Sequence, residues 1–141
     1  MDNAISTANW SDRYLTIPYI DGGRDIAIGL DCWGLVRGVL HQHFNTPLLK
    51  DFGNIHADDK ANMTKAYGQV KKAFLPCSPI KGAVAAGFNG RLLIHVGVVV
   101  EANGLKVLHT SSKHGMCRCS LRHFERLFSH VKYYAYQQGE C

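Results

Sequence analysis

The feature that most limits how this chain folds is a pair of apolar segments joined by Asn103-Gly104. Residues 95–101 are rich in valine, and a second apolar run covers residues 105–110. β-Branched residues favour strands, and Asn-Gly is the dipeptide most typical of a tight turn between antiparallel strands. The sequence therefore predicts a β-hairpin over residues 95–110, within an antiparallel sheet.

The length of the hairpin loop decides whether His95 and His109 share a face. A two-residue loop would place Val98 opposite His109 and put the two histidines on opposite faces. A three-residue loop over residues 102–104, with a left-handed glycine bulge, places Gly97 opposite His109 and makes His95 its diagonal neighbour. We predict the bulged loop, because Gly97 then leaves space beside the two imidazoles.

A cysteine opens the first predicted helix, which covers residues 31–44. Apolar residues follow Cys32 at helical spacing, and the Asp31 carboxylate can accept hydrogen bonds from the first turn. A thiol at this position feels the positive end of the helix dipole, which favours the thiolate. The sequence therefore predicts a nucleophilic cysteine with a lowered pKa.

The order of the elements indicates an α+β fold. A second helix is expected over residues 57–75, strands over 83–86 and 92–94, a short helix over 121–128 and a last strand over 131–137. Helices come first and an antiparallel sheet follows. At 141 residues the chain is expected to form a single domain over residues 1–141.

Composition and charge limit the kinds of molecule and the cellular setting that we expect for this protein. The apolar fraction of 46% is ordinary for a globular protein, and no segment is long enough for a transmembrane helix, so no membrane insertion is expected. The N-terminus lacks a basic region followed by an apolar run, which predicts no signal peptide and synthesis in the cytoplasm. The net charge of +5 weakly favours acidic partners, and an anionic surface such as a cell wall fits this charge as well as nucleic acid does. The sequence contains no nucleic-acid-binding motif, so no nucleic acid is expected.

A cysteine nucleophile needs a base, and the base needs a group that orients it. His95 begins a very apolar strand, and His109 ends the strand predicted to pair with it. Polar side chains at these apolar positions suggest a function. We therefore predict Cys32 as nucleophile, His95 as base and His109 as the orienting group.

The remaining cysteines are expected to be free thiols. The odd count of five argues against a disulfide framework. A zinc or iron–sulfur site is the alternative, but the spacings fit no familiar pattern, and no cofactor is expected. The residues of this alternative site would be Cys77, Cys117, Cys119 and Cys141.

These elements, in this order, resemble the NlpC-like murein cysteine peptidases, a papain-like family. The matching segments are Asp31-Cys32-Trp33-Gly34-Leu35-Val36, His95-Val96-Gly97-Val98, His109 and Tyr19-Ile20-Asp21-Gly22-Gly23. The resemblance implies N-terminal helices packed on a C-terminal antiparallel sheet. It also implies cleavage of peptidoglycan stem peptides after γ-D-glutamate, before diaminopimelate. Tyr19, Asp31 and Trp33 would then border the substrate and the developing oxyanion, together with the Cys32 backbone N–H.

Two departures from the family pattern refine this expectation. Trp33 stands where bacterial members usually carry serine, and no aspartate follows Gly82. The form Asp-Cys-Trp-Gly-Leu-Val-Arg looks like members that tailed phages encode as tail components. We therefore expect a tail-tip peptidase, made in the host cytoplasm, assembled with tail-hub or tail-tip proteins and carried in the virion to open the cell wall. The alternatives are a secreted antibacterial effector amidase, and a structural tail-tip subunit with a vestigial or metal-binding site.

Overall fold

The computed structural model describes residues 9–53, 55–56 and 58–137, and it has a six-stranded antiparallel sheet at its centre. The strand order is β3-β8-β4-β5-β6-β7, and a separate two-stranded sheet pairs β1 with β2. The expected α+β class is confirmed. The strands are β1 (Arg24–Asp25), β2 (Gly29–Leu30), β3 (Phe74–Pro76), β4 (Val84–Asn89), β5 (Leu92–Glu101), β6 (Leu105–Ser111), β7 (Gly115–Ser120) and β8 (His130–Tyr136).

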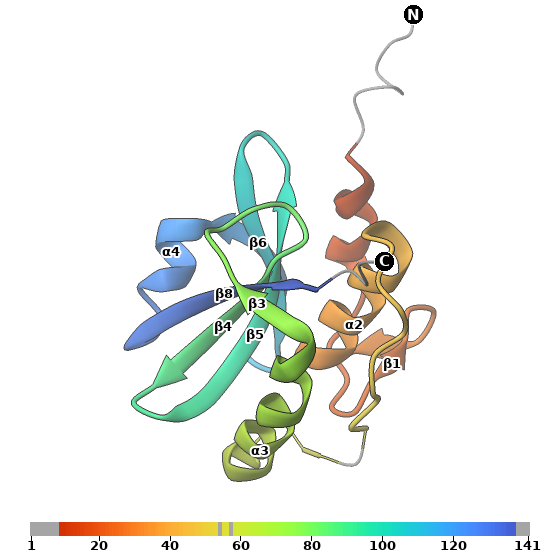
Figure 1. Cartoon of the computed structure of the whole chain (residues 1–141). Helices are drawn as coiled ribbons and strands as arrows, with labels where there is room; N and C mark the ends of the chain where they lie inside the picture. Colours follow the sequence, from red (N-terminus) through yellow and green to blue (C-terminus); the bar gives the residue numbers. More distant parts are fainter. Residues whose placement is uncertain (1–8, 54, 57, 138–141) are drawn as a thin grey trace, which may run out of the picture.

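Helices cover both faces of the large sheet, with α2 on one side and α4 on the other (Figure 1). The helical elements are η1 (Trp10–Thr16), α2 (Cys32–His43), α3 (Lys60–Val70), η2 (Lys71–Ala73) and α4 (Leu121–Glu125). The core between α2 and the sheet contains Leu35, Val36 and Val98, whereas the core under α4 contains Val99 and Phe124. Consecutive strand residues point to opposite faces, so Val98 and Val99 belong to different cores.

The predicted bulged hairpin is confirmed. Val98 pairs with Leu108 and Glu101 with Leu105, which is the register of the three-residue loop. Gly104 has a φ of 97°, and its carbonyl accepts a hydrogen bond of 2.9 Å from the Ala102 N–H. The ladder between β5 and β6 ends at the Val98–Leu108 pair.

The predicted strand over residues 92–94 is wrong as a separate element, because residues 92–101 form one strand with a bulge. Gly87 pairs with His95 but Phe88 pairs with Leu93, so Ile94 is the extra residue. The extra residue changes the face of the sheet to which the side chains after the bulge point. As a result, Leu93 and Val96 both join the core under α2.

Two predicted helices end elsewhere in the structure, and one strand is not predicted by the sequence. The second helix is shorter than residues 57–75, because Phe74–Pro76 pairs with β8 instead of continuing the helix, and residue 57 lies outside the described residues. The helix predicted over 121–128 ends at Glu125. Strand β7 was not predicted, although it pairs along its whole length with β6. None of the helices in the described ranges is both long and apolar enough to cross a membrane.

Candidate active site

The start of α2 is fixed by the side chain of Asp31, as the sequence predicts. Its Oδ1 atom accepts a hydrogen bond of 2.8 Å from the Gly34 N–H, and its Oδ2 atom accepts one of 3.0 Å from the Gly22 N–H. One carboxylate therefore caps the helix and closes the preceding loop. Cys32 follows the cap directly, so its position depends on both contacts.

Arg24 is a site residue that the sequence analysis missed. Its Nη1 atom donates to Asp31 Oδ1 at 2.6 Å, and its Nε atom lies 3.1 Å from Asp51 Oδ1. The Arg24–Asp31 pair is largely buried, with side chains 13% and 7% exposed. Arg24 thereby ties the cap of α2 to the segment around residue 51, a pairing that no local sequence pattern indicates.

Three glycines allow the loop and the helix to touch through their backbones. A Cβ atom at Gly34 would lie 2.1 Å from the Gly23 carbonyl oxygen, and one at Gly23 would lie 2.4 Å from the Gly29 carbonyl oxygen. A Cβ at Gly29 would meet the Ile20 side chain at 2.5 Å. These contacts give a physical reason for the glycine two residues after Cys32.

The Cys32 thiol is buried and protonated, which corrects the expected lowering of its pKa. Cys32 is 7% exposed, and burial together with the Asp31 carboxylate raises the pKa of its thiol to about 11. The backbone N–H of Val96 donates to the sulfur and opposes this rise, as do the charges of Lys60 and Arg24. Desolvation and the capping carboxylate therefore outweigh the helix dipole.

His95 and His109 lie together on the α4 face of the sheet. His95 Nε2 and His109 Nδ1 are 3.0 Å apart, and the rings meet edge to face at a centroid distance of 5.1 Å. Phe124 contacts both rings and Phe128 stacks on His95. Gly97 provides the predicted space, since a Cβ there would lie 3.0 Å from His109 Cβ.

Both imidazoles are neutral at pH 7. Burial lowers the pKa of His95 to about 3, with smaller contributions from His109 and Lys60. Burial also lowers the pKa of His109 to about 4, and the charges of His123 and His114 act in the same direction. Each ring therefore carries one N–H, and the contact between them has one donor and one acceptor.

The structure brings the three predicted catalytic residues to one region without joining all of them. The Cys32 sulfur contacts the backbone of Val96, the residue after His95, where the β5–β6 ladder has ended. Cys32 packs in the core under α2, whereas both imidazoles pack under α4. Within the described ranges, no hydrogen bond joins the Cys32 thiol to His95 or to His109.

Tyr19 and Trp33 are the other two residues predicted to lie around the nucleophile, and Trp33 lines the same cavity as Cys32. Burial raises the pKa of Tyr19 to about 12, with a contribution from Cys32, so the phenol lies within electrostatic reach of the thiol. Trp33 donates from Nε1 to the Lys50 carbonyl at 2.9 Å and contacts Phe52. Trp33 therefore holds the segment around residue 51 beside the nucleophile.

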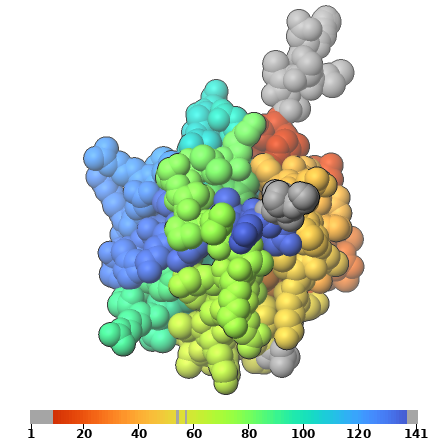
Figure 2. Space-filling view, viewed as in Figure 1, coloured from red at the N-terminus to blue at the C-terminus, as the bar shows by residue number. Residues whose placement is uncertain are grey.

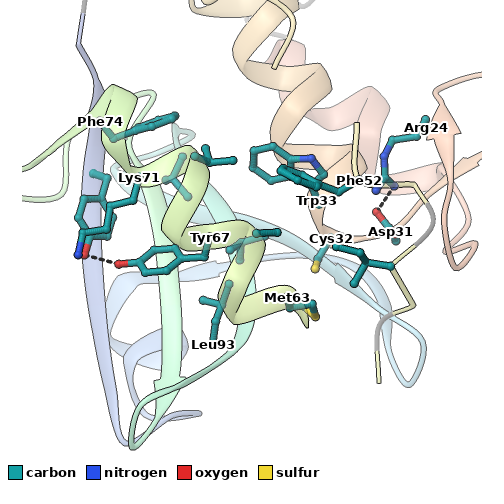
Figure 3. Close-up of a pocket in the computed structure, with 16 residues that line it drawn as sticks. Arg24, Asp31, Cys32, Trp33, Phe52, Met63, Tyr67, Lys71, Phe74 and Leu93 are labelled. Carbon is teal, nitrogen blue, oxygen red and sulfur yellow. Dashed lines mark hydrogen bonds and ion pairs between the residues drawn. The ribbon is translucent and has the colours of Figure 1, made fainter. Parts of the chain in front are cut away.

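An apolar cavity of about 80 Å³ adjoins the thiol and is partly open to solvent. Figure 3 shows the Cys32 sulfur facing this cavity near Met63, with Arg24 and Asp31 at one end and Tyr67 and Phe74 towards the other. In Figure 2, α3 (yellow-green) and the segment around residue 50 (orange-yellow) are neighbours on the surface, and residues of both line the cavity. Neither His95 nor His109 belongs to the lining.

Lys60 is a second site residue that the sequence analysis missed. Its Nζ atom donates to the Ile94 carbonyl at 2.9 Å, at the bulge next to His95. Its charge lowers the pKa of both Cys32 and His95. Lys60 is the first residue of α3, so only the tertiary packing of that helix brings the charge here.

The four cysteines of the alternative metal site do not form a ligand cluster in the described part of the chain. Cys117 and Cys119 lie on β7 and Cys77 follows β3, whereas Cys141 lies outside the described residues. Among the described residues, no group of three or more histidine, cysteine, aspartate or glutamate side chains is placed to hold a metal ion.

Comparison with protein-family models gives no match, and a search of the curated proteins gives none either. The candidate site consists of a buried thiol beside an apolar cavity, a phenol within electrostatic reach of that thiol, and a pair of neutral imidazoles under α4.

Proposed function

We propose that this chain is an NlpC-like, papain-like cysteine peptidase that cleaves peptidoglycan stem peptides, after γ-D-glutamate. The observation that carries the proposal is the His95–His109 pair beside the strand position that Cys32 contacts. His95 uses Nε2 for His109, which leaves Nδ1 as the nitrogen available to a thiol. The resemblance itself rests on the capped cysteine helix, the hairpin that carries the two histidines, and the loop that begins at Tyr19.

The mechanism begins from neutral groups, because the pKa of Cys32 is raised and that of His95 is lowered. His95 Nδ1 takes the thiol proton as Sγ bonds to the substrate carbonyl carbon, and the carbonyl oxygen becomes an oxyanion. This step requires a thiol–imidazole contact that closes when substrate binds, since catalytic hydrogen bonds commonly tighten only in the complex. His109 stabilises the imidazolium that forms on His95.

Collapse of the tetrahedral intermediate breaks the carbon–nitrogen bond. His95 gives its proton to the leaving amine, and the acyl group stays on Cys32 as a thioester. Water, deprotonated by His95, then hydrolyses the thioester and restores the thiol. The N–H of Cys32, at the helix start, and the Tyr19 hydroxyl are the donors suited to the oxyanion.

The cavity suits the apolar parts of a stem peptide, its alanine methyl groups and the methylene chain of diaminopimelate. The net charge of +5 suits the anionic wall around them. The form of the cysteine motif supports a place at the tip of a phage tail, with delivery to the wall by the virion and contacts to tail-hub or tail-tip proteins.

A second candidate is a structural tail-tip subunit with a vestigial site. The absence of a thiol–imidazole hydrogen bond in the described residues and the raised pKa of Cys32 favour it. The two candidates differ in one measurement, the release of peptide products from murein.

The test is digestion of purified murein, with mass analysis of the soluble products. We expect γ-D-glutamyl products from the wild type, none from Cys32→Ala, and a nearly equal loss in His95→Gln, because the pair acts as one unit. Cys77→Ala is the matched control and should stay active. Wild-type protein that releases nothing would favour the structural subunit, and an active Cys32→Ala variant would end the cysteine-peptidase proposal.

Delivery is tested separately by quantitative mass spectrometry of purified virions. The protein should be present at low copy number in mature particles. If particles lack it while it accumulates in the host lysate, the tail assignment fails and an effector amidase becomes the better proposal.

A further inference from the structure

A chain of polar contacts crosses three neighbouring strands beneath α4. His95 on β5 contacts His109 on β6 at 3.0 Å, and His109 Nε2 lies 3.5 Å from the sulfur of Cys119 on β7. Both ring nitrogens of His109 are therefore engaged, one with the proposed base and one with a thiol. The function proposed above gives Cys119 no part. A role for it follows from which atoms of His95, His109 and Cys119 carry the hydrogen-bonding protons.

Two arrangements of protons are compatible with two neutral imidazoles. In the first, His95 Nε2–H donates to His109 Nδ1, and His109 Nε2–H donates to the Cys119 sulfur. In the second, the thiol donates to His109 Nε2, and His109 Nδ1–H donates to His95 Nε2. Only the first leaves His95 Nδ1 without a proton and able to accept one from Cys32.

We propose that Cys119 is a positioning residue, which accepts the His109 Nε2–H and so fixes the tautomer of His109 that keeps His95 Nδ1 free as a base. The inference rests on the proposed function, since it assigns Cys119 a part in the same reaction. Cys119 acts through His109 and touches no reacting atom.

The surroundings of Cys119 suit this role. Burial and the neighbouring Cys117 raise the pKa of the Cys119 thiol to about 11, so the sulfur is uncharged at pH 7 and leaves the imidazoles neutral. The aromatic rings of Phe124 and Phe128 cover the two imidazoles, and a hydrogen bond shielded from water is stronger than an exposed one.

Cys117 provides a matched comparison on the same strand. It is the register partner of His109, directly opposite in the ladder, whereas Cys119 pairs with Val107 and reaches His109 diagonally. Within the part of the chain that the structure describes, Cys117 has no hydrogen bond to either imidazole. Cys117 is therefore a control thiol on the same strand that lacks the contact to His109.

The first test uses the wild-type protein labelled with ¹⁵N-histidine. Two-bond ¹H–¹⁵N correlation spectra at pH 7 report which ring nitrogen carries the proton. We expect the Nε2–H tautomer for both His95 and His109. A wild-type His109 in the Nδ1–H tautomer would overturn the inference without any variant having to fold.

The second test compares variants. Cys119→Val should shift His109 towards a mixture of tautomers and lower kcat on murein roughly three- to tenfold with KM unchanged, the size expected for one weak hydrogen bond. Cys119→Ser keeps an acceptor, so it should restore most of the His109 Nε2–H tautomer and most of the kcat. Cys117→Val should change neither the tautomer nor the kcat. An unchanged His109 tautomer in Cys119→Val overturns the inference. If wild-type protein cleaves no murein, the proposed function fails while the spectra still decide the tautomer.

Discussion

Replacing Asp31 with asparagine should destabilise the fold and, at the same time, make Cys32 more reactive. The carboxylate accepts from two backbone N–H groups and from Arg24, and all three contacts are 3.0 Å or shorter. Asparagine keeps one acceptor oxygen, which can still cap α2. Its amide NH₂ would then face the Gly22 N–H, a second donor, and Arg24 would lose a charged partner.

The size of the stability loss follows from these contacts. An unsatisfied buried donor costs about 1–3 kcal/mol, and a hydrogen bond to a charged group contributes about 1.5–3 kcal/mol. Arg24 keeps Asp51 as a partner, which limits the second contribution. We therefore expect the free energy of unfolding to fall by about 2–4 kcal/mol.

The effect on the thiol has the opposite sign. The Asp31 charge raises the pKa of Cys32, so its removal lowers that pKa from about 11 and increases the thiolate fraction at any pH below it. Burial is the larger cause and remains, so the pKa should stay above the ordinary thiol value. The two readouts are urea unfolding by circular dichroism and the pH dependence of Cys32 alkylation, measured by peptide mass.

Asp12→Asn is the control. Asp12 pairs with Arg118 at 2.7 Å, but its side chain is 52% exposed, so the variant should lose no more than about 1 kcal/mol. Equal losses in the two variants would refute the argument from burial. An alkylation profile of Cys32 that stays in place or moves to higher pH in Asp31→Asn would refute the electrostatic part.

Two further predictions concern the histidine pair. Gly97→Ala should destabilise the protein by about 1–3 kcal/mol, because its Cβ would lie 2.6 Å from Val107 Cγ1. Gly38→Ala is the control, because no atom lies within 4 Å of its Cβ, and this variant should stabilise α2 by about 0.5–1 kcal/mol. Similar urea midpoints for Gly97→Ala and Gly38→Ala would contradict the steric argument. The free energy of unfolding should fall as the pH drops from about 6.5 towards 4, because unfolded histidines take up protons near pH 6.5 and the folded pair only near pH 4 and 3. The double variant His95→Gln/His109→Gln should flatten this pH dependence, and an unchanged slope would count against the neutral pair.

The parts of the fold that the sequence predicts correctly are those with strong local signals. The Asn103-Gly104 turn sets the hairpin register, and Asp31 with the following apolar spacing sets the start of α2. Strand β7 was missed because its residues are half-buried or exposed and show no alternation. Phe74 was assigned to a helix because its pairing with Tyr136 joins residues far apart in the chain.

In the candidate site, too, the sequence predicts the features that depend on local structure and misses those that depend on the whole fold. The contact between His95 and His109 follows from the hairpin alone, and the sequence predicts it. The pKa of Cys32 was predicted with the wrong sign, because the helix dipole is a local effect whereas burial depends on the whole fold. Arg24 reaches Asp31 through the two-residue pairing of β1 with β2, which is too short to show in the sequence, and Lys60 reaches the site only through the packing of α3.

The backbone contacts among Gly23, Gly29 and Gly34 bear on how this nucleophile would be moved to another scaffold. A designer who transplanted α2 alone would leave behind the loop whose carbonyl oxygens Gly34 and Gly23 approach. The portable unit is the segment of residues 19–43, which holds the loop, Arg24 and the whole of α2, with an acidic residue supplied in place of Asp51. Within that unit a combinatorial library should keep positions 23, 29 and 34 as glycine, whereas Ile28, 63% exposed, can be varied freely.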